Sequence, residues 1–398
     1  MRALAHLIAV ALASAVGTAA LAASTWSAAA SLASVPVAWW STAQIAQAAI
    51  VLACGLGTAG CLWHLASAGL ALTVLLQDAL ATADARGAPA GAAAGSRANA
   101  ALQRWGAPLV RRIAAGAVVA GLTIAPVAAG TAVALGHGGA SAPRAALAAA
   151  LALCLQVGVN FANDYSDGIR GTDDVRTGPP RLTGGGEASP SSVRAAAFAC
   201  FGLGSLVGAI LVALSGRWWL LGVGAAAVAA AWFYTGGRRP YGYMGLGEVF
   251  VFVFFGLVAT AGTTYTQLLG VPWQSWLAAC SVGSIACALL MVNNIRDIPT
   301  DAASGKRTLA VRLGDRRART AYASAVALPV LAAAALWGDL GALTLLVLAP
   351  CLPLALTAIR PVLSGARGLA LIPSLKATGF VELAYGVALL MAYAIARP

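Results

Sequence analysis

Asn160-Phe-Ala-Asn-Asp-Tyr-Ser-Asp-Gly-Ile-Arg-Gly-Thr-Asp-Asp174 is an acidic stretch that closes a long apolar run, in a chain with only 13 acidic residues among 398. A second acidic stretch, Asn293-Asn-Ile-Arg-Asp-Ile-Pro-Thr-Asp301, closes another apolar run, and its Asn293 follows Asn163 by 130 residues. Carboxylates beside long apolar segments are energetically costly, so they indicate a bound cation or another function. We expect the rest of the chain to bring the first and second acidic stretches together.

The composition is that of a membrane protein. The chain is 60% hydrophobic and 10% charged, with a mean hydropathy of +0.83, whereas soluble domains carry about 25% charged residues. The net charge of +12 does not predict a nucleic-acid partner, because the basic residues lie in short loops between apolar runs. The positive-inside rule accounts for that distribution. We therefore predict an all-α polytopic membrane protein.

Apolar runs of about 20 residues are candidates to span the bilayer. Eleven occur, at about 3–23, 45–77, 112–136, 146–163, 193–215, 217–235, 247–268, 275–295, 319–337, 340–358 and 377–396. The first is expected to be an anchor rather than a cleaved signal peptide. We predict a two-helix membrane extension over 1–80, a flexible cytoplasmic linker over 81–111 that is rich in Ala, Gly and Ser, and a nine-helix body over 112–398.

The basic residues predict the orientation of the chain. If the N-terminus is cytoplasmic, 22 of the 25 Lys and Arg residues lie on the cytoplasmic side, and only Arg144, Arg217 and Arg397 lie outside. This asymmetry predicts a multi-pass protein of the cell membrane, embedded in the lipid bilayer, with both acidic stretches facing the cytoplasm.

The spacing of the carboxylates predicts two pairs. Asp164 and Asp167 are three residues apart, so on a helix they share a face. Asp297 and Asp301 are four apart and do the same, unless Pro299 breaks the helix first. Two such pairs facing one another across a cavity would suit Mg²⁺, which prefers oxygen ligands and is often completed by substrate phosphates and water.

The polar neighbours of these acids leave two interpretations open. Asn163 and Asn293 would add amide oxygens to a metal site or orient the carboxylates. Alternatively, the acids cap helices or pair with Arg170 and Arg296, and no metal is involved. Because two matched stretches are predicted on the same side of the membrane, we favour the metal site.

Cations suited to a diphosphate accompany the acidic stretches. Arg170 follows the first stretch, Lys306 follows the second, and Arg238 and Arg239 follow Tyr234. Basic side chains together with a metal stabilise the negative charge that develops on a departing phosphate. The alternative is that they are positive-inside anchors; for Lys306, one of only two lysines, we favour function. Tyr234 would flank a carbocation through its ring or belong to an interfacial aromatic belt.

Four motifs together resemble a known family. They are the first acidic stretch, Tyr234-Thr-Gly-Gly with Pro240-Tyr-Gly-Tyr243, the second acidic stretch, and Gly305-Lys-Arg-Thr-Leu-Ala-Val-Arg-Leu-Gly-Asp315. The pattern resembles the UbiA-type intramembrane prenyltransferases. Within that superfamily it is most similar to the 1,4-dihydroxy-2-naphthoate polyprenyltransferases of menaquinone synthesis. The resemblance covers roughly residues 112–398.

The resemblance implies a fold, a reaction and a set of site residues. The fold is a UbiA-type bundle of nine helices around a central cavity, here preceded by about two extra transmembrane helices. The reaction is a Mg²⁺-dependent transfer from polyprenyl diphosphate to 1,4-dihydroxy-2-naphthoate, with loss of CO₂ and diphosphate, to give demethylmenaquinone. Carried over by position, the metal ligands would be Asp164, Asp167, Asp297 and Asp301, assisted by Asn163, and the phosphate contacts would be Arg170, Arg238 and Lys306.

The chain departs from the family pattern at two places. Where distant members have a further Asp, this chain has Gly171, and either Asp173 or Asp174 would supply the remaining ligand. An Arg-Pro-Arg-Thr stretch of close relatives is absent, and Arg111 or Arg112 stands near its place.

Two alternative functions stay open at this point. One is a related prenyltransferase that uses another acceptor, such as 4-hydroxybenzoate or a sugar phosphate. The other is a cation-coupled transporter, although transporter sites usually lie near the bilayer midplane on broken helices.

Overall fold

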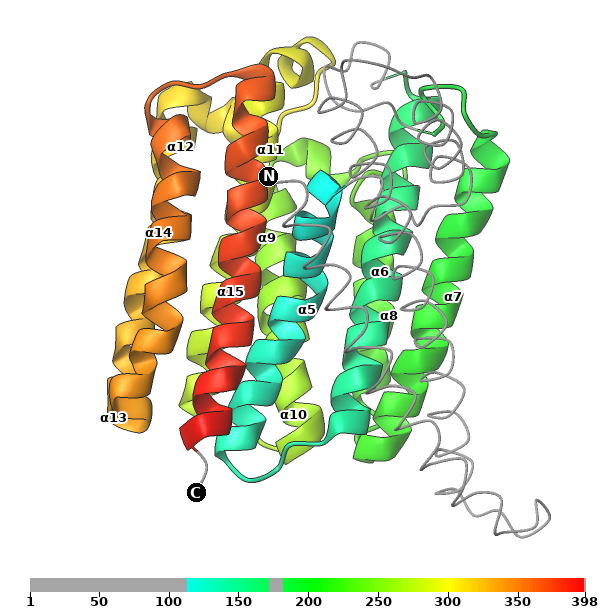
Figure 1. Cartoon of the computed structure of the whole chain (residues 1–398). Helices are drawn as coiled ribbons and strands as arrows, with labels where there is room; N and C mark the ends of the chain where they lie inside the picture. The colour runs from blue at the N-terminus through cyan, green and yellow to red at the C-terminus, as the bar shows by residue number, and fades with distance from the viewer. Residues whose placement is uncertain (1–112, 172–181, 397–398) are drawn as a thin grey trace, which may run out of the picture. The chain divides into compact units, whose positions relative to one another are not determined.

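A computed structural model describes residues 113–171 and 182–396, and within these ranges every regular element is helical (Figure 1). The α-helices are α5 (Ile113–Gly136), α6 (Ala142–Ile169), α7 (Pro190–Ser215), α8 (Leu220–Phe233), α9 (Gly247–Val251), α10 (Gly262–Leu268), α11 (Trp273–Ala303), α12 (Leu309–Ala332), α13 (Trp337–Leu340), α14 (Thr344–Leu363) and α15 (Ile372–Ala396). The other turns are the 3₁₀ helices η2 (Tyr241–Met244), η4 (Ala333–Leu336), η5 (Gly341–Leu343) and η6 (Gly368–Leu371), and the π-helix η3 (Phe252–Ala261). The predicted all-α class is confirmed for this part of the chain.

Several predictions fall on the remaining residues and stay predictions. Two predicted segments lie outside the described ranges: the two-helix extension over 1–80 and the linker over 81–111. Four candidate residues also lie outside them, namely Arg111, Arg112, Asp173 and Asp174.

The described helices are those of a multi-pass membrane protein. Six helical stretches are long and apolar enough to cross a membrane, and Gly121–Gly136 and Leu220–Phe233 are shorter apolar helices. One of the six, Leu309–Leu363, folds back on itself, since α12 packs against α14. The reversal occurs at Gly341, whose φ of 52° suits a residue without a side chain. Each apolar run predicted after residue 112 contains a helix in the part that is described.

Helix α11 is the central element of the bundle. It packs against α12, α15, α9 and η3, and 67% of its membrane-spanning window is buried. Small residues permit the contact with η3: a Cβ atom at Gly256 would lie only 2.5 Å from the Gly283 Cα atom. Close backbone approach through small residues is the usual way in which membrane helices pack, because lipid gives no hydrophobic drive for their association.

The two acidic stretches close α6 and α11, and both helices end at the top of the bundle as drawn in Figure 1. Helix α11 continues through Pro299 to Ala303, so Pro299 does not break the helix. Proline costs the helix one backbone hydrogen bond, here within its last two turns. Asp297 and Asp301 therefore share a helical segment, as the four-residue spacing predicts.

Candidate active site

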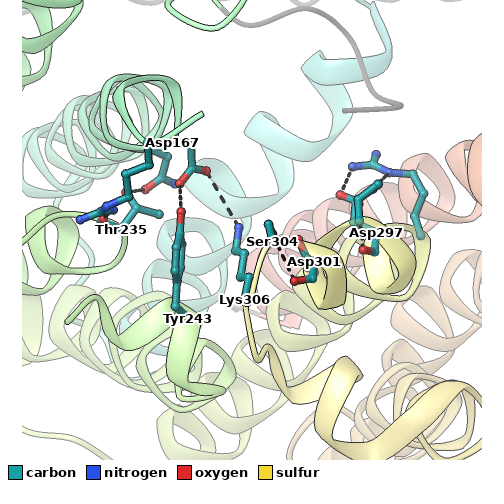
Figure 2. A network of polar contacts seen from close by, with 11 residues as sticks. Asp167, Thr235, Tyr243, Asp297, Asp301, Ser304 and Lys306 are labelled. Atoms are coloured by element: carbon teal, nitrogen blue, oxygen red, sulfur yellow. Dashed lines mark hydrogen bonds and ion pairs between the residues drawn. The ribbon is translucent and has the colours of Figure 1, made fainter. Parts of the chain in front are cut away.

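Asp167 lies near the end of α6, is only 4% exposed, and is held by residues from two distant segments. The Tyr243 hydroxyl donates a 2.7 Å hydrogen bond to its Oδ1 atom. The Lys306 Nζ atom lies 3.9 Å from its Oδ2 atom and 4.9 Å from the centre of the Tyr243 ring. The carboxylate, the phenol and the ammonium group thus form one cluster (Figure 2).

Lys306 also connects this cluster to the second acidic stretch. Its backbone N–H donates to the Asp301 carbonyl at 2.8 Å, and the next backbone N–H, of Arg307, donates to the Tyr243 carbonyl at 3.0 Å. Gly305 precedes it with a φ of 76°, the left-handed conformation that ends many helices. Figure 2 shows the lysine side chain between Asp167 and Asp301, so the structure brings the two acidic stretches to one place.

Asp297 and Asp301, the second pair of acids, have different surroundings. Asp301 is 9% exposed and lies beside the Lys306 turn. Asp297 accepts two hydrogen bonds from the adjacent Arg296, at 2.7 Å from Nε and 2.6 Å from Nη2. For Asp297 the structure therefore shows the pairing with Arg296 that was the alternative to a metal site, and its role as a ligand stays a prediction.

Asp164 anchors the loop that precedes α7. Its Oδ2 and Oδ1 atoms accept the backbone N–H groups of Leu182 and Thr183, at 2.9 and 2.8 Å. The loop approaches α6 closely, because a Cβ atom at Gly168 would lie 2.5 Å from the Thr183 Cγ2 atom. A carboxylate has about four lone-pair positions, so these two bonds leave room for another ligand.

The loop between α8 and η2 is attached to the end of α6. Thr235 donates to the Asn163 Oδ1 atom at 2.9 Å, and Arg170 donates to the carbonyls of Thr235 and Gly237. Arg170 therefore positions this loop, and its contact with a diphosphate stays a prediction. Arg238 and Arg239 are exposed on the same loop.

Tyr234 follows α8 and lies beside the start of α9, since a Cβ atom at Gly247 would lie 3.4 Å from its Oη atom. Its predicted role beside a carbocation stays a prediction. The Gly242 N–H donates to its carbonyl at 2.9 Å, and a Cβ atom at Gly242 would lie 2.7 Å from that oxygen. A glycine is thus required where the loop folds over Tyr234.

Reasoning from the sequence missed two buried groups beside this site, Glu248 and Asn294. The Asn294 amide donates to the Glu248 Oε1 atom at 3.2 Å. An acid within an apolar run is itself a signal of function, and Glu248 opens the predicted run at 247–268.

The oxygen-rich donor set fits magnesium bound together with a diphosphate. Within residues 113–171 and 182–396, no three acidic, histidine or cysteine side chains gather into a metal-binding group. Mg²⁺ needs fewer, because it commonly takes one or two protein carboxylates and completes its octahedron with phosphate oxygens and water. Asp167 and Asp301 could supply such carboxylates, and Asn163 and the half-buried Asn293 carry amide oxygens nearby in sequence.

Comparison with known proteins agrees with this arrangement. The UbiA prenyltransferase family model matches residues 123–367. The 1,4-dihydroxy-2-naphthoate octaprenyltransferase of Mycobacterium tuberculosis is 50% identical over 279 residues, which cover 69% of this chain and 93% of that protein. The enzyme of the same name from Mycobacterium leprae is 47% identical over 278 residues, covering 69% and 92%.

A solved structure shares the fold. The apo structure of a UbiA homolog from Aeropyrum pernix K1 has a TM-score of 0.54 at 18% sequence identity, and the match covers 70% of this chain and 98% of that one. With the family model matching more than half of the residues and relatives at about half identity, the chain belongs to the UbiA prenyltransferase family.

Proposed function

We propose that the protein transfers a polyprenyl group from polyprenyl diphosphate to 1,4-dihydroxy-2-naphthoate, releasing diphosphate and CO₂ and forming demethylmenaquinol, the reduced form of demethylmenaquinone. The names and near-complete coverage of the mycobacterial relatives support the acceptor and the donor class. The structural observation that carries the proposal is Lys306, held between Asp167 and Asp301. This arrangement offers a cation and two buried carboxylates to one diphosphate. Membership in a prenyltransferase family also decides against the transporter alternative.

The donor end of the site would separate the diphosphate from the allylic carbon. Mg²⁺, when bound, supplies positive charge that neutralises the leaving group. Asp167 and Asp301 would hold the ion, with Asp164, Asp297, Asn163 and Asn293 as further donors. Lys306 would bind phosphate oxygens, and Arg238 and Arg239 on the neighbouring loop would add positive charge.

The transfer itself needs an apolar and electron-rich environment. The allylic carbon–oxygen bond breaks with its electron pair going to the diphosphate, and the helical interior keeps water from the cation. The Tyr234 ring would stabilise that cation through its negative face. The ring carbon that carries the carboxylate then bonds to the allylic carbon, and the electron pair of the breaking bond to CO₂ returns to the ring.

The site is proposed to face the cytoplasm of the cell membrane. The loops at the site end carry Arg170, Arg238, Arg239 and Lys306, whereas Arg144 and Arg217 belong to the opposite end. An excess of basic residues marks the cytoplasmic side.

Transfer in a defined membrane tests the function. The full chain in liposomes would receive 1,4-dihydroxy-2-naphthoate, octaprenyl diphosphate and Mg²⁺, with 4-hydroxybenzoate as a competing acceptor. We expect a prenylated naphthoquinol and an equal amount of CO₂, both abolished by EDTA and restored by added Mg²⁺. Prenylation of 4-hydroxybenzoate in preference to the naphthoate would contradict the proposed acceptor.

A further inference from the structure

Glu248 is an ionisable side chain buried in the interior of the bundle. It is 7% exposed, and so is Asn294, whose amide donates to it at 3.2 Å. Its backbone carbonyl accepts a hydrogen bond from the Cys287 thiol at 3.0 Å. Burying a carboxyl group costs free energy unless strong partners compensate it, and here the side-chain partner on α11 is a neutral amide.

Glu248 and Asn294 lie farther from the end of the bundle than the proposed diphosphate site does. Asn294 precedes Asp301 by seven residues on α11, which is two helical turns on the same face and a rise of about 10 Å. On the other side, the start of α9 packs against Tyr234, because a Cβ atom at Gly247 would lie 3.4 Å from the Tyr234 Oη atom. Glu248 and Asn294 therefore lie in the region beneath the two acidic stretches.

The substrates of the proposed function define what must occupy that space. If Asp301 and Lys306 hold the diphosphate, the allylic carbon extends from it toward the apolar interior. The acceptor ring must lie against this carbon, since reacting atoms approach to about 3 Å. The polar groups at that depth are then the ones that meet the ring hydroxyls.

We infer that Glu248, held in place by Asn294, accepts a hydrogen bond from the acceptor hydroxyl next to the carboxyl-bearing carbon. This inference rests on the proposed function and assigns it an acceptor-binding group. A carboxylate accepts such a bond more strongly than a neutral amide does. A purely structural residue would need no charge, because a glutamine would accept the same bond from Asn294.

The hydrogen bond would also aid the chemistry. As the hydroxyl proton is drawn toward Glu248, electron density moves into the ring and onto the adjacent carbon, which becomes the better nucleophile. After the carbon–carbon bond forms and CO₂ leaves, the proton remains on the hydroxyl oxygen. The quinol keeps both hydroxyls, and no proton is gained or lost at this position.

The test is Glu248→Gln in the full chain, with Glu187→Gln on the exposed surface as the matched control. We expect kcat/KM for the naphthoate to fall about 10- to 100-fold, as for loss of a hydrogen bond to a charged group. The KM for the prenyl diphosphate should stay within about twofold of wild type, because the donor does not reach this pair. Asn294→Ala should lower kcat/KM for the naphthoate by a smaller factor and should likewise leave the KM for the prenyl diphosphate nearly unchanged.

Substrate analogues separate a direct contact from a structural effect. As competitive inhibitors, 1-hydroxy-2-naphthoate keeps the hydroxyl in question and 4-hydroxy-2-naphthoate lacks it. Wild type should bind the first about tenfold more tightly, and Glu248→Gln should bind both alike. An unchanged preference in Glu248→Gln, at any level of activity, would overturn the inference, because a folding defect alone leaves the ratio intact.

The two proposals fail differently. A wild-type protein that prenylates no naphthoate would remove the proposed function and this inference together. An active wild type whose Glu248→Gln variant has normal naphthoate kinetics would remove this inference alone.

Discussion

The Lys306 Nζ atom lies 3.9 Å from the Asp167 Oδ2 atom, although 139 residues separate the two in sequence. The ammonium group compensates the negative charge of a buried carboxylate. In the proposed function, Lys306 would contact a phosphate oxygen of the bound donor, and Asp167 would be a ligand of Mg²⁺. The proposed function therefore predicts that Lys306 and Asp167 exchange partners when the donor binds.

Lys306→Met should weaken donor binding. The variant keeps the length of the side chain but removes its charge, so the KM for prenyl diphosphate should rise at least about tenfold, in line with a charge-assisted hydrogen bond. The KM for the naphthoate should change little. Steady-state kinetics measure both, and Lys376→Met, at the chain's other lysine, should behave as wild type. Equal donor KM values for the two variants would contradict the role of Lys306.

Asp164→Asn and Asp167→Asn should differ in stability. Asp164 accepts two backbone N–H groups of the loop, whereas an asparagine side chain has only one oxygen to accept them. Loss of a charged hydrogen bond costs about 1.5–3 kcal/mol, so Asp164→Asn should lower the unfolding temperature in detergent. Asp167→Asn keeps a side-chain oxygen for the Tyr243 hydroxyl and loses the charge of a 3.9 Å contact with the partly exposed Lys306, so it should lose activity with a smaller loss of stability. Thermal unfolding and turnover of both variants test this contrast, and an Asp164→Asn protein as stable as wild type would contradict it.

Gly242→Ala should disable the site through the backbone. The added Cβ atom would lie 2.7 Å from the Tyr234 carbonyl oxygen, so the loop must move and Tyr234 must move with it. We expect a strong loss of turnover. Gly224→Ala on α8, where a Cβ meets nothing within 4 Å, should retain activity and gain up to about 1 kcal/mol of helix stability. Normal turnover in Gly242→Ala would show that the loop tolerates displacement.

Arg144→Ala should lower stability and leave catalysis intact. At the end of the bundle opposite the site, Arg144 donates to the carbonyls of Leu214 and Thr266, at 2.7 and 2.9 Å. These carbonyls lie near the C-terminal ends of α7 and α10, where backbone acceptors lack partners within their own helix. The unfolding temperature should drop, whereas Arg217→Ala, at an exposed arginine of the same end, should leave it unchanged. Altered substrate KM values in Arg144→Ala would contradict a purely structural role.

The sequence alone predicted much of this architecture because its strongest signals are local. Apolar runs predict helices, and the placement of Asp167 and Asp301 at two helix ends follows from where those runs stop. The family resemblance is confirmed, and so is the all-α class of the described residues.

The contacts that are not local could not be read from the sequence. The backbone N–H groups of Leu182 and Thr183 donate hydrogen bonds to Asp164 across a loop. The Asn294 amide donates a hydrogen bond to Glu248 across a helix interface. Whether Asp297 faces a metal or Arg296 depends on a choice of rotamer, which residue spacing does not determine. The continuation of α11 through Pro299 runs against the helix propensity of proline, which would favour a break.

Donor-dependent metal binding tests most directly whether the two acidic stretches form one site. Binding of Mn²⁺ as a probe, with a prenyl thiodiphosphate that resists cleavage, would be measured by electron paramagnetic resonance on wild type, Asp167→Asn, Asp301→Asn and the double variant. If both carboxylates serve one site, each single variant should lose most of the donor-dependent binding, and the double variant should be little worse, because residues that act as a unit are not additive. Two results would contradict a single site formed by both acidic stretches. One is donor-dependent Mn²⁺ binding in Asp301→Asn equal to that of wild type, and the other is a double variant whose loss of binding free energy equals the sum of the two single losses.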